Sequence, residues 1–202
     1  MFANLAIISS LLYFCVIYTD SLYVKYLLKP TTTLLIIGVG LESDNVRNNA
    51  KLAGLIFSLL GDIFLMFSGE DMFILGLSSF LTAHIFYIYM FYSTKKRNQA
   101  SALFGLFSIA SVYFSFLYSS IFQEGGIVMT VAVAVYIIVI TFMVYYALMN
   151  DNTNLSIGVF LFFISDATLA LDKFLYHAPD RRCEYIVMIT YYAAQFCIAR
   201  YY

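Results

Sequence analysis

The feature that most constrains this chain is a succession of apolar runs separated by short polar segments. Each run is close to the roughly 20 residues that an α-helix needs to cross a hydrocarbon core about 30 Å thick. The runs therefore predict an all-α fold, a polytopic transmembrane bundle of eight helices with short loops, as a single domain over residues 1–202. The eight predicted spans cover about 3–19, 22–40, 51–68, 72–92, 101–120, 126–149, 154–172 and 183–200.

Composition agrees with this class of protein and argues against others. Hydrophobic residues make up 62% of the chain and charged residues 11%, whereas soluble domains are about half apolar and about a quarter charged. The net charge is −1 and the largest basic cluster is Lys95-Lys96-Arg97, so no nucleic acid partner is expected. The three cysteines, an odd number with two in apolar runs, predict neither a disulfide framework nor a CxxC metal site. The first run lacks a basic leader, so we expect it to stay as an anchor.

The charges of the loops predict the orientation of the bundle. The loops at 45–51 and 93–100 carry Lys and Arg, whereas the loops between them carry Glu70, Asp71 and Glu124. An excess of Lys and Arg marks the cytoplasmic side, which places both termini in the cytoplasm. The last loop, with Lys173, Arg181 and Arg182, opposes this assignment.

Two apolar runs each hold a carboxylate well inside them. Asp62 lies in Phe57-Ser-Leu-Leu-Gly-Asp-Ile-Phe-Leu-Met66, and Asp166 lies in Phe162-Phe-Ile-Ser-Asp-Ala-Thr-Leu169. A carboxylate at the bilayer centre costs about 2.5–3.5 kcal/mol on insertion scales, so such residues usually mark functional sites. The alternative is a protonated Asp that hydrogen-bonds between helices and contributes about 0.6–2 kcal/mol, a contact that Ser, Thr or Asn makes at lower cost.

The two carboxylates belong to a weak internal repeat. Gly61-Asp62-x-x-Leu65 and Ser165-Asp166-x-x-Leu169 lie four predicted spans apart, an even number that gives both halves the same orientation. Such a parallel repeat places Asp62 and Asp166 at similar depths, where they can converge between the halves. The match is only a few positions long, and chance is the alternative explanation.

Other polar groups in the predicted spans are candidates to line the same site. Lys29, beside the helix-kinking Pro30, either snorkels toward the interface or lines a polar cavity, where it receives a phosphate or pairs with a buried Asp. His84 is either a satisfied hydrogen-bonding residue or part of the site, and Tyr87 lies on the same helix face. The eighth span adds Tyr191, Tyr192 and Gln195. The spans 101–120 and 126–149 carry no ionisable groups except tyrosines and are expected to be scaffold.

Two buried carboxylates are compatible with more than one function. Carboxylates that flank a scissile C–O bond supply acid and base for hydrolysis, because one stays protonated while the other is ionised near a cation or water. Intramembrane carboxylates also relay protons, so a proton-coupled transporter is the main alternative and a non-catalytic lipid-binding protein the third. His84, Asp62 and Asp166 lack metal-binding spacings such as HxxxH, and no GxSxG nucleophile motif is present. We therefore expect no metal and no organic cofactor.

The order of these motifs resembles the lysoplasmalogenases, a family of YhhN-like integral membrane proteins. The matching elements are Lys29-Pro30, Ser58-Leu-Leu-Gly-Asp62 with Leu65, Phe73-x-x-Gly76-x-x-x-Phe80-x-x-x-His84-x-x-Tyr87, Gly158-x-x-Leu-Phe-x-x-Ser165-Asp166 and Tyr191-Tyr192-x-x-Gln195. They extend from the second to the eighth predicted span. The first span and residues 173–182 match no element of the family.

This resemblance implies eight transmembrane helices in the endoplasmic reticulum or another internal membrane. It also implies hydrolysis of the vinyl ether bond of lysoplasmalogens to a fatty aldehyde and glycerophosphoethanolamine or glycerophosphocholine. Vinyl ether hydrolysis begins with protonation of the β-carbon and passes through an oxocarbenium ion that water attacks, so it needs an acid and a carboxylate. We hypothesise that Asp62 and Asp166, the family's buried pair, take these two roles. The supporting or substrate-binding residues are predicted to be Lys29, Ser58, His84, Tyr87, Ser165, Tyr191, Tyr192 and Gln195.

Overall fold

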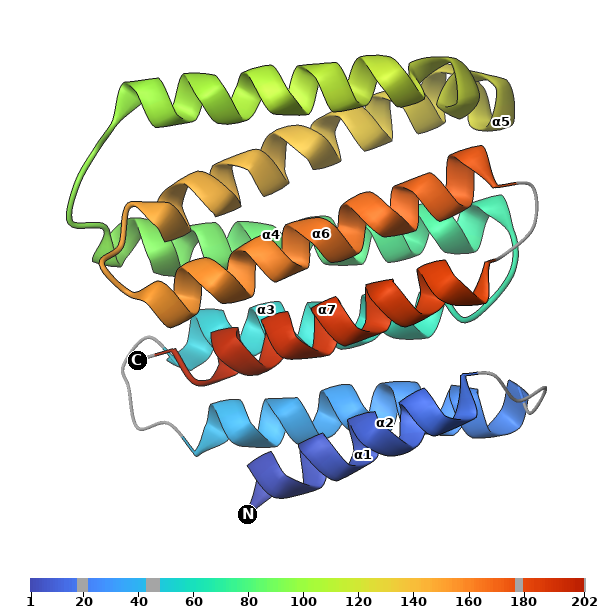
Figure 1. The fold of residues 1–202 in the computed structure, drawn as a ribbon, viewed down its shortest axis with the longest axis vertical. Helices are drawn as coiled ribbons and strands as arrows, with labels where there is room; N and C mark the ends of the chain where they lie inside the picture. The colour runs from blue at the N-terminus through green and yellow to red at the C-terminus, as the bar shows by residue number, and fades with distance from the viewer. Residues whose placement is uncertain (18–21, 43–47, 177–179, 202) are drawn as a thin grey trace.

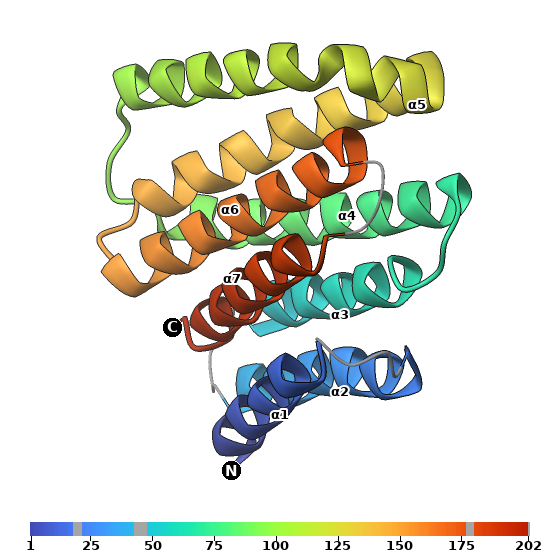
Figure 2. The same cartoon turned by 45° about the vertical axis from the view of Figure 1, so that its right-hand side comes forward.

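The computed structural model describes residues 1–17, 22–42, 48–176 and 180–201, and the described residues form seven helices and no strands (Figures 1 and 2). The helices are α1 (Phe2–Val16), α2 (Leu22–Leu41), α3 (Asn48–Phe64), α4 (Glu70–Thr94), α5 (Ala100–Leu148), α6 (Thr153–Leu175) and α7 (Arg181–Ala199). They run roughly along one direction, and each packs against the next in the chain, while α7 also packs against α2 and α3. The all-α fold class is confirmed.

The described residues form seven helices where eight were predicted, and the difference lies in α5. The predicted spans 101–120 and 126–149 both lie in α5, whose two arms run back alongside each other (Figures 1 and 2). The chain reverses at Gly125 and Gly126, where φ/ψ are −135°/16° and 59°/−152°. A positive φ is accessible to glycine at little cost, so the reversal takes place within two residues and no separate loop divides the arms.

One predicted helix boundary also needs correction. The predicted span 51–68 ends earlier, because α3 stops at Phe64 and a turn follows. Glu70 and Asp71, expected in a loop, form the first turn of α4, where carboxylates interact favourably with the helix dipole. The predicted end of the first span, residues 18 and 19, lies outside the described residues.

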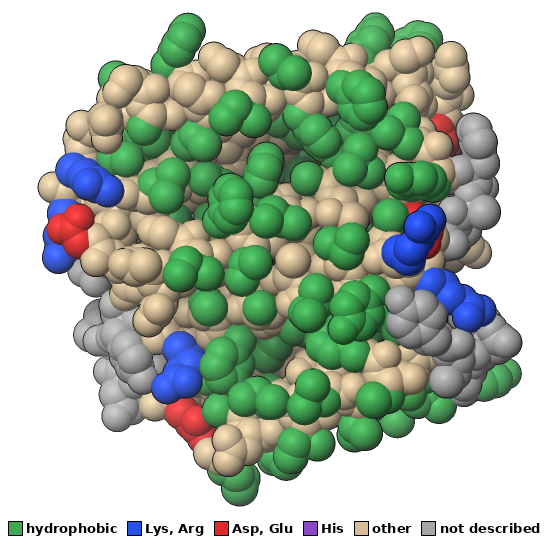
Figure 3. Space-filling view, in the orientation of Figure 1, with side chains coloured by type: hydrophobic (Ala, Val, Ile, Leu, Met, Phe, Trp, Pro, Cys, Tyr) green, Lys and Arg blue, Asp and Glu red, His purple; other side chains and the backbone are tan. Residues whose placement is uncertain are grey.

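The outer surface matches a bilayer environment. By length and composition, four of the seven helices in the described ranges are able to cross a membrane: α2 from Tyr23, α4, α5 and α6. On α5, Phe104 and Val112 are 77% and 72% exposed, and hydrophobic side chains cover the middle of the molecule while charged ones gather near the two ends (Figure 3). The chain is a multi-pass membrane protein. Both termini lie at the same end of the bundle (Figure 1), which agrees with their predicted placement on one side.

Close packing between α3 and α4 fixes the position of the carboxylate on α3. Gly61, the residue before Asp62, lies under the ring of Phe80, and a Cβ atom at position 61 would be 2.5 Å from Phe80 Cε2. The ring of Phe80 also packs edge-on against Tyr191 of α7, with 5.8 Å between centroids. The small residue of the motif therefore lets three helices approach each other next to Asp62.

Candidate active site

A cavity of about 410 Å³ opens at the end of the bundle away from the termini, and both predicted carboxylates line it. Its walls come from the C-terminal halves of α1, α3 and α6 and the N-terminal parts of α2 and α7. The sequence-predicted residues that line it are Lys29, Asp62, Ser165, Asp166 and Tyr191. Half of the predicted site residues, from four helices, therefore meet at one cavity.

Asp62 is held by hydrogen bonds and by a cation. Its side chain is 2% exposed. The Thr33 hydroxyl and the Tyr191 hydroxyl each donate to Asp62 Oδ2 at 2.7 Å, and Lys29 Nζ lies 3.7 Å from Asp62 Oδ1. The two donors and the ammonium group favour the ionised carboxylate, whereas burial of the side chain favours the neutral acid.

A proline in α2 lies between two of these partners, Lys29 and Thr33. Pro30 lies inside the helix and cannot donate a backbone hydrogen bond. The hydroxyls of Thr31 and Thr32 donate to backbone carbonyl oxygens four residues earlier, at 2.7 and 2.8 Å. The Thr33 hydroxyl lies 3.4 Å from the carbonyl oxygen of Lys29 and donates at 2.7 Å to Asp62. Of the two interpretations of Lys29, lining a polar cavity agrees with the structure, and there Lys29 pairs with a buried Asp.

Asp166 has a different set of partners. The Tyr136 hydroxyl donates to Asp166 Oδ2 at 2.5 Å, and His84 Nε2 lies 3.2 Å from the same oxygen and 2.8 Å from the Tyr136 hydroxyl. His84 is fully buried, with its ring edge-on to Phe162. The carboxylate of Asp166 is 11% exposed, so it is more accessible from the cavity than Asp62.

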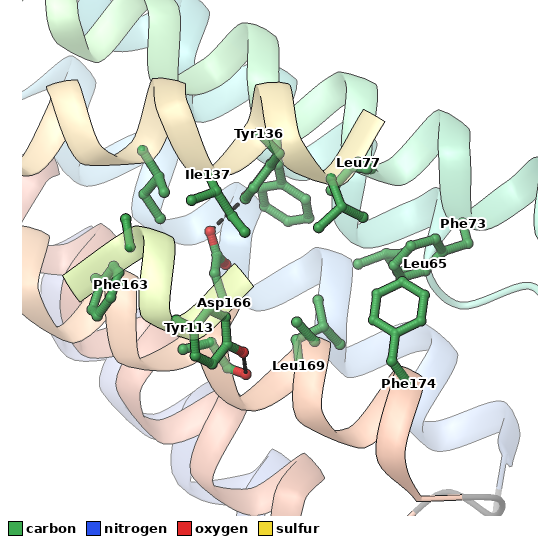
Figure 4. Close-up of a pocket in the computed structure, with 16 residues that line it drawn as sticks. Leu65, Phe73, Leu77, Tyr113, Tyr136, Ile137, Phe163, Asp166, Leu169 and Phe174 are labelled. Carbon is green, nitrogen blue, oxygen red and sulfur yellow. Dashed lines mark hydrogen bonds between the residues drawn. The ribbon is translucent and has the colours of Figure 1, made fainter. Parts of the chain in front are cut away.

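Asp166 also faces a second, apolar space (Figure 4). This narrow slot of about 60 Å³ lies mainly between α4, α5 and α6, and its other lining residues are nearly all hydrophobic. The slot and the larger cavity share Leu65, Phe80, Asp166 and Leu169. Asp166 therefore lies at the boundary between a polar cavity and an apolar slot.

Five predicted residues lie behind the cavity instead of lining it. Tyr87 donates to Gln195 Oε1 at 2.9 Å, and the Tyr87 hydroxyl is 3.5 Å from Ser58 Oγ. Tyr192 packs edge-on against Tyr13. His84, although buried, reaches the cavity only through Asp166. His84 and Tyr87 share a helix face but contact different groups: His84 contacts Asp166, and Tyr87 contacts Gln195.

Sequence reasoning missed several residues of the site. Tyr136 belongs to a span that was expected to be scaffold, and this expectation was wrong because its hydroxyl contacts Asp166. A lone hydroxyl in a long aliphatic stretch was the available signal. Thr33 lies one helical turn after Lys29, and Lys25, which also lines the cavity, lies one turn before it. The 3.6-residue period places all three on one face of α2.

No group of three or more His, Cys, Asp or Glu side chains within the described ranges is arranged to hold a metal ion. The candidate site consists instead of two separately supported carboxylates, a lysine and tyrosine hydroxyls. Such groups transfer protons and stabilise charge.

Comparison with known proteins identifies the family. Residues 24–201 match the YhhN family. The chain belongs to the YhhN family. Lysoplasmalogenase TMEM86A of Bos taurus is 32% identical over 176 residues, which cover 82% of this chain and 70% of the relative. The Homo sapiens protein of the same name is 30% identical with the same coverage. Lysoplasmalogenase TMEM86B of Mus musculus is 33% identical over 141 residues, or 70% of this chain and 58% of the relative. No solved structure matches this YhhN protein.

Proposed function

We propose that this protein is a membrane hydrolase that cleaves the vinyl ether bond of lysoplasmalogens. The products are a fatty aldehyde and glycerophosphoethanolamine or glycerophosphocholine. The observation that carries the proposal is that Asp62 and Asp166 line one cavity, with Asp166 at its boundary to an apolar slot. The names of the TMEM86 relatives support the choice of substrate.

The shape of the site matches the shape of the substrate. A lysoplasmalogen has a polar headgroup and an apolar chain, and its vinyl ether lies where the two join. The cavity carries the charged side chains, and the slot is apolar apart from Asp166 and two tyrosines. A headgroup in the cavity and the first carbons of the chain in the slot place the vinyl ether beside Asp166.

The surroundings of the two carboxylates favour a division of roles. Asp62, with Lys29 and two hydroxyl donors, is the carboxyl group whose neighbours favour a negative charge. Asp166 is held by a tyrosine and a histidine, is more accessible than Asp62 and borders the apolar slot, so it is the carboxyl group that can reach the β-carbon on the chain side of the vinyl ether. We assign Asp166 as the proton donor and Asp62 as the carboxylate that stabilises the cation and activates water.

The reaction then follows in three steps. Asp166 transfers its proton to the β-carbon of the vinyl ether, which leaves an oxocarbenium ion next to the carboxylates. Asp62 accepts a proton from water as the water oxygen bonds to the cationic carbon, giving a hemiacetal. In the collapse of the hemiacetal, Asp62 gives its proton to the glycerol oxygen as the bond between that oxygen and the former vinyl carbon breaks. Asp166 takes the proton of the hemiacetal hydroxyl, so the aldehyde and the glycerol hydroxyl are released and both carboxyl groups regain their starting protonation states.

The position of the cavity favours a hydrolase over a proton-coupled transporter. Transport requires water to reach the carboxylates from both sides of the membrane. The cavity opens at one end of the bundle, and on α3 the residues between Asp62 and the opposite end include Lys51, Leu55 and Ser58, each at most 2% exposed. A one-sided cavity is what a lipid hydrolase needs.

The cellular location is part of the proposal. We place the protein in the endoplasmic reticulum or another internal membrane with both termini in the cytoplasm, so that the cavity opens toward the lumen. Antibody access to a C-terminal tag after selective permeabilisation of the plasma membrane tests this orientation. A tag that becomes accessible only when internal membranes are also permeabilised contradicts it.

The decisive experiment is aldehyde release by purified protein in detergent. We expect Asp62→Asn and Asp166→Asn each to lower the rate about 10²-fold or more, the range for loss of a general acid or base. The matched control is Asp151→Asn, because Asp151 pairs with Lys96 at the exposed opposite end. Folded Asp62→Asn and Asp166→Asn variants with full activity would refute the assignment.

A further inference from the structure

A second ion pair in the cavity wall has no role in the chemistry proposed above. Lys25 Nζ on α2 donates to Glu184 Oε2 on α7 at 3.0 Å, and the Tyr13 hydroxyl on α1 donates to Glu184 Oε1 at 2.9 Å. All three residues line the same cavity as Asp62. The side chains of Lys25 and Glu184 are 15% and 32% exposed, so the pair is accessible from the cavity and only partly screened by solvent.

This pair continues a line of charges that begins at the candidate catalytic carboxylate. Lys25 and Lys29 are four residues apart on α2, so their Cβ atoms lie about 5–6 Å apart on neighbouring turns of one face. Lys29 pairs with Asp62 and Lys25 pairs with Glu184. From the inside of the cavity outward, the order of groups is therefore carboxylate, ammonium, ammonium, carboxylate.

The substrate class proposed above carries the complementary order of charges. From its vinyl ether, a lysoplasmalogen continues through glycerol to a phosphate anion and then, two carbons on, to an ammonium group. When the vinyl ether lies between the two Asp residues, the phosphate lies beside Lys25 and Lys29. The ammonium group then comes to Glu184. The Lys25–Glu184 pair is a ready site for a zwitterion, because each member exchanges its partner for an opposite charge on the ligand, while Lys29 stays beside Asp62.

We propose that Glu184, positioned by Tyr13, binds the ammonium group of the headgroup while Lys25 and Lys29 bind its phosphate. This inference rests on the proposed function. It makes Glu184 a specificity-determining residue that selects amine-bearing headgroups. A primary ammonium donates hydrogen bonds to the carboxylate, whereas a trimethylammonium group has no N–H donor and is attracted by charge and by an aromatic face. Glu184 therefore discriminates most strongly in favour of ethanolamine.

The test compares three substrates that share one alkenyl chain: the phosphoethanolamine, the phosphocholine and the bare glycerophosphate, which lacks an amine. The quantity measured is the ratio of kcat/KM for the ethanolamine substrate to that for the bare phosphate. We expect Glu184→Gln to lower this ratio about tenfold or more, since it removes a charge-assisted hydrogen bond. Tyr13→Phe keeps every charge and should lower the ratio by a smaller factor. It provides the test if Glu184→Gln does not fold.

The matched control is Glu124→Gln. Glu124 also pairs with a lysine, Lys173, at the same end of the bundle, but both line a neighbouring cavity and neither lines the candidate site, so the substitution of Glu124 leaves the ratio unchanged. A folded Glu184→Gln or Tyr13→Phe variant with the wild-type ratio, or with an equal loss on all three substrates, overturns the inference and leaves the hydrolase intact. Wild-type protein that releases no aldehyde from any of the three substrates overturns the proposed function itself.

Discussion

The hydroxyl donors on Asp62 give the sharpest quantitative prediction. Thr33 and Tyr191 donate to the same oxygen of a carboxylate that is 2% exposed. Thr33→Val and Tyr191→Phe each remove one donor and leave the side-chain shape nearly unchanged. A hydrogen bond to a charged group contributes about 1.5–3 kcal/mol, and each 1.36 kcal/mol changes a rate about tenfold. Each variant is therefore expected to lower kcat/KM about 10- to 150-fold.

The double variant tests whether the two hydroxyls act through one group. Without either donor, Asp62 Oδ2 is left buried and unpaired, so the loss of activity should approach that of Asp62→Asn. Removing one partner from a buried charge costs more than the bond itself contributes. Aldehyde release by purified variants, with thermal unfolding in detergent as the check on folding, measures both effects.

The chain contains a matched control for this series. Thr31 lies two residues before Thr33, and its hydroxyl donates at 2.7 Å to the carbonyl of Leu27 in its own helix. Thr31→Val makes the same chemical change next to the same proline and should leave activity unchanged. The reasoning is refuted if folded Thr33→Val and Tyr191→Phe retain full activity, or if Thr31→Val loses as much as Thr33→Val.

Three further predictions concern the walls of the site. Tyr136→Phe removes the 2.5 Å hydrogen bond to the second carboxylate and should lower kcat about tenfold, a change of about 1.4 kcal/mol, in the aldehyde assay. Leu169→Ala widens the junction of the polar cavity and the slot and should raise the relative rate for bulkier, unsaturated chains in competition between substrates. Gly61→Ala forces the ring of Phe80 to move and should destabilise the protein by about 1–3 kcal/mol, seen as a lower Tm, whereas Gly105→Ala meets no neighbouring atom and should not.

Hydropathy alone was sufficient to predict the helical bundle, because a bilayer requires long apolar helices with internally satisfied backbones. It was not sufficient to show how two of the predicted helices are joined. The segment around Gly125 and Gly126 reads as a loop, but a two-residue reversal keeps both arms in α5. The turn depends on two backbone conformations, and hydropathy carries no information about those.

The two carboxylates were predictable because their cost in a membrane is a property of the residue itself. Their partners were less predictable, because tyrosine and threonine are ordinary residues in membrane helices. Tyr136 became part of the site only when the second arm of α5 packed against α6. Conversely, Ser58, Tyr87 and Gln195 were placed at the site by sequence but form their own hydrogen-bonded group behind it. A polar side chain inside a predicted span indicates that it has a hydrogen-bonding partner, but the sequence does not show which group that partner is.

The repeated motif explains why the two halves resemble each other in position but not in chemistry. Asp62 lies 14 residues after the start of α3 at Asn48, and Asp166 lies 13 residues after the start of α6 at Thr153, so the two reach similar depths along helices of the same direction. The leucine three positions after each Asp lines all three cavities at this end. The neighbouring helices differ, however, and supply a lysine to one carboxylate and a histidine with a tyrosine to the other. The repeat gives the two carboxyl groups similar positions, and their different neighbours allow one to act as an acid and the other as a base.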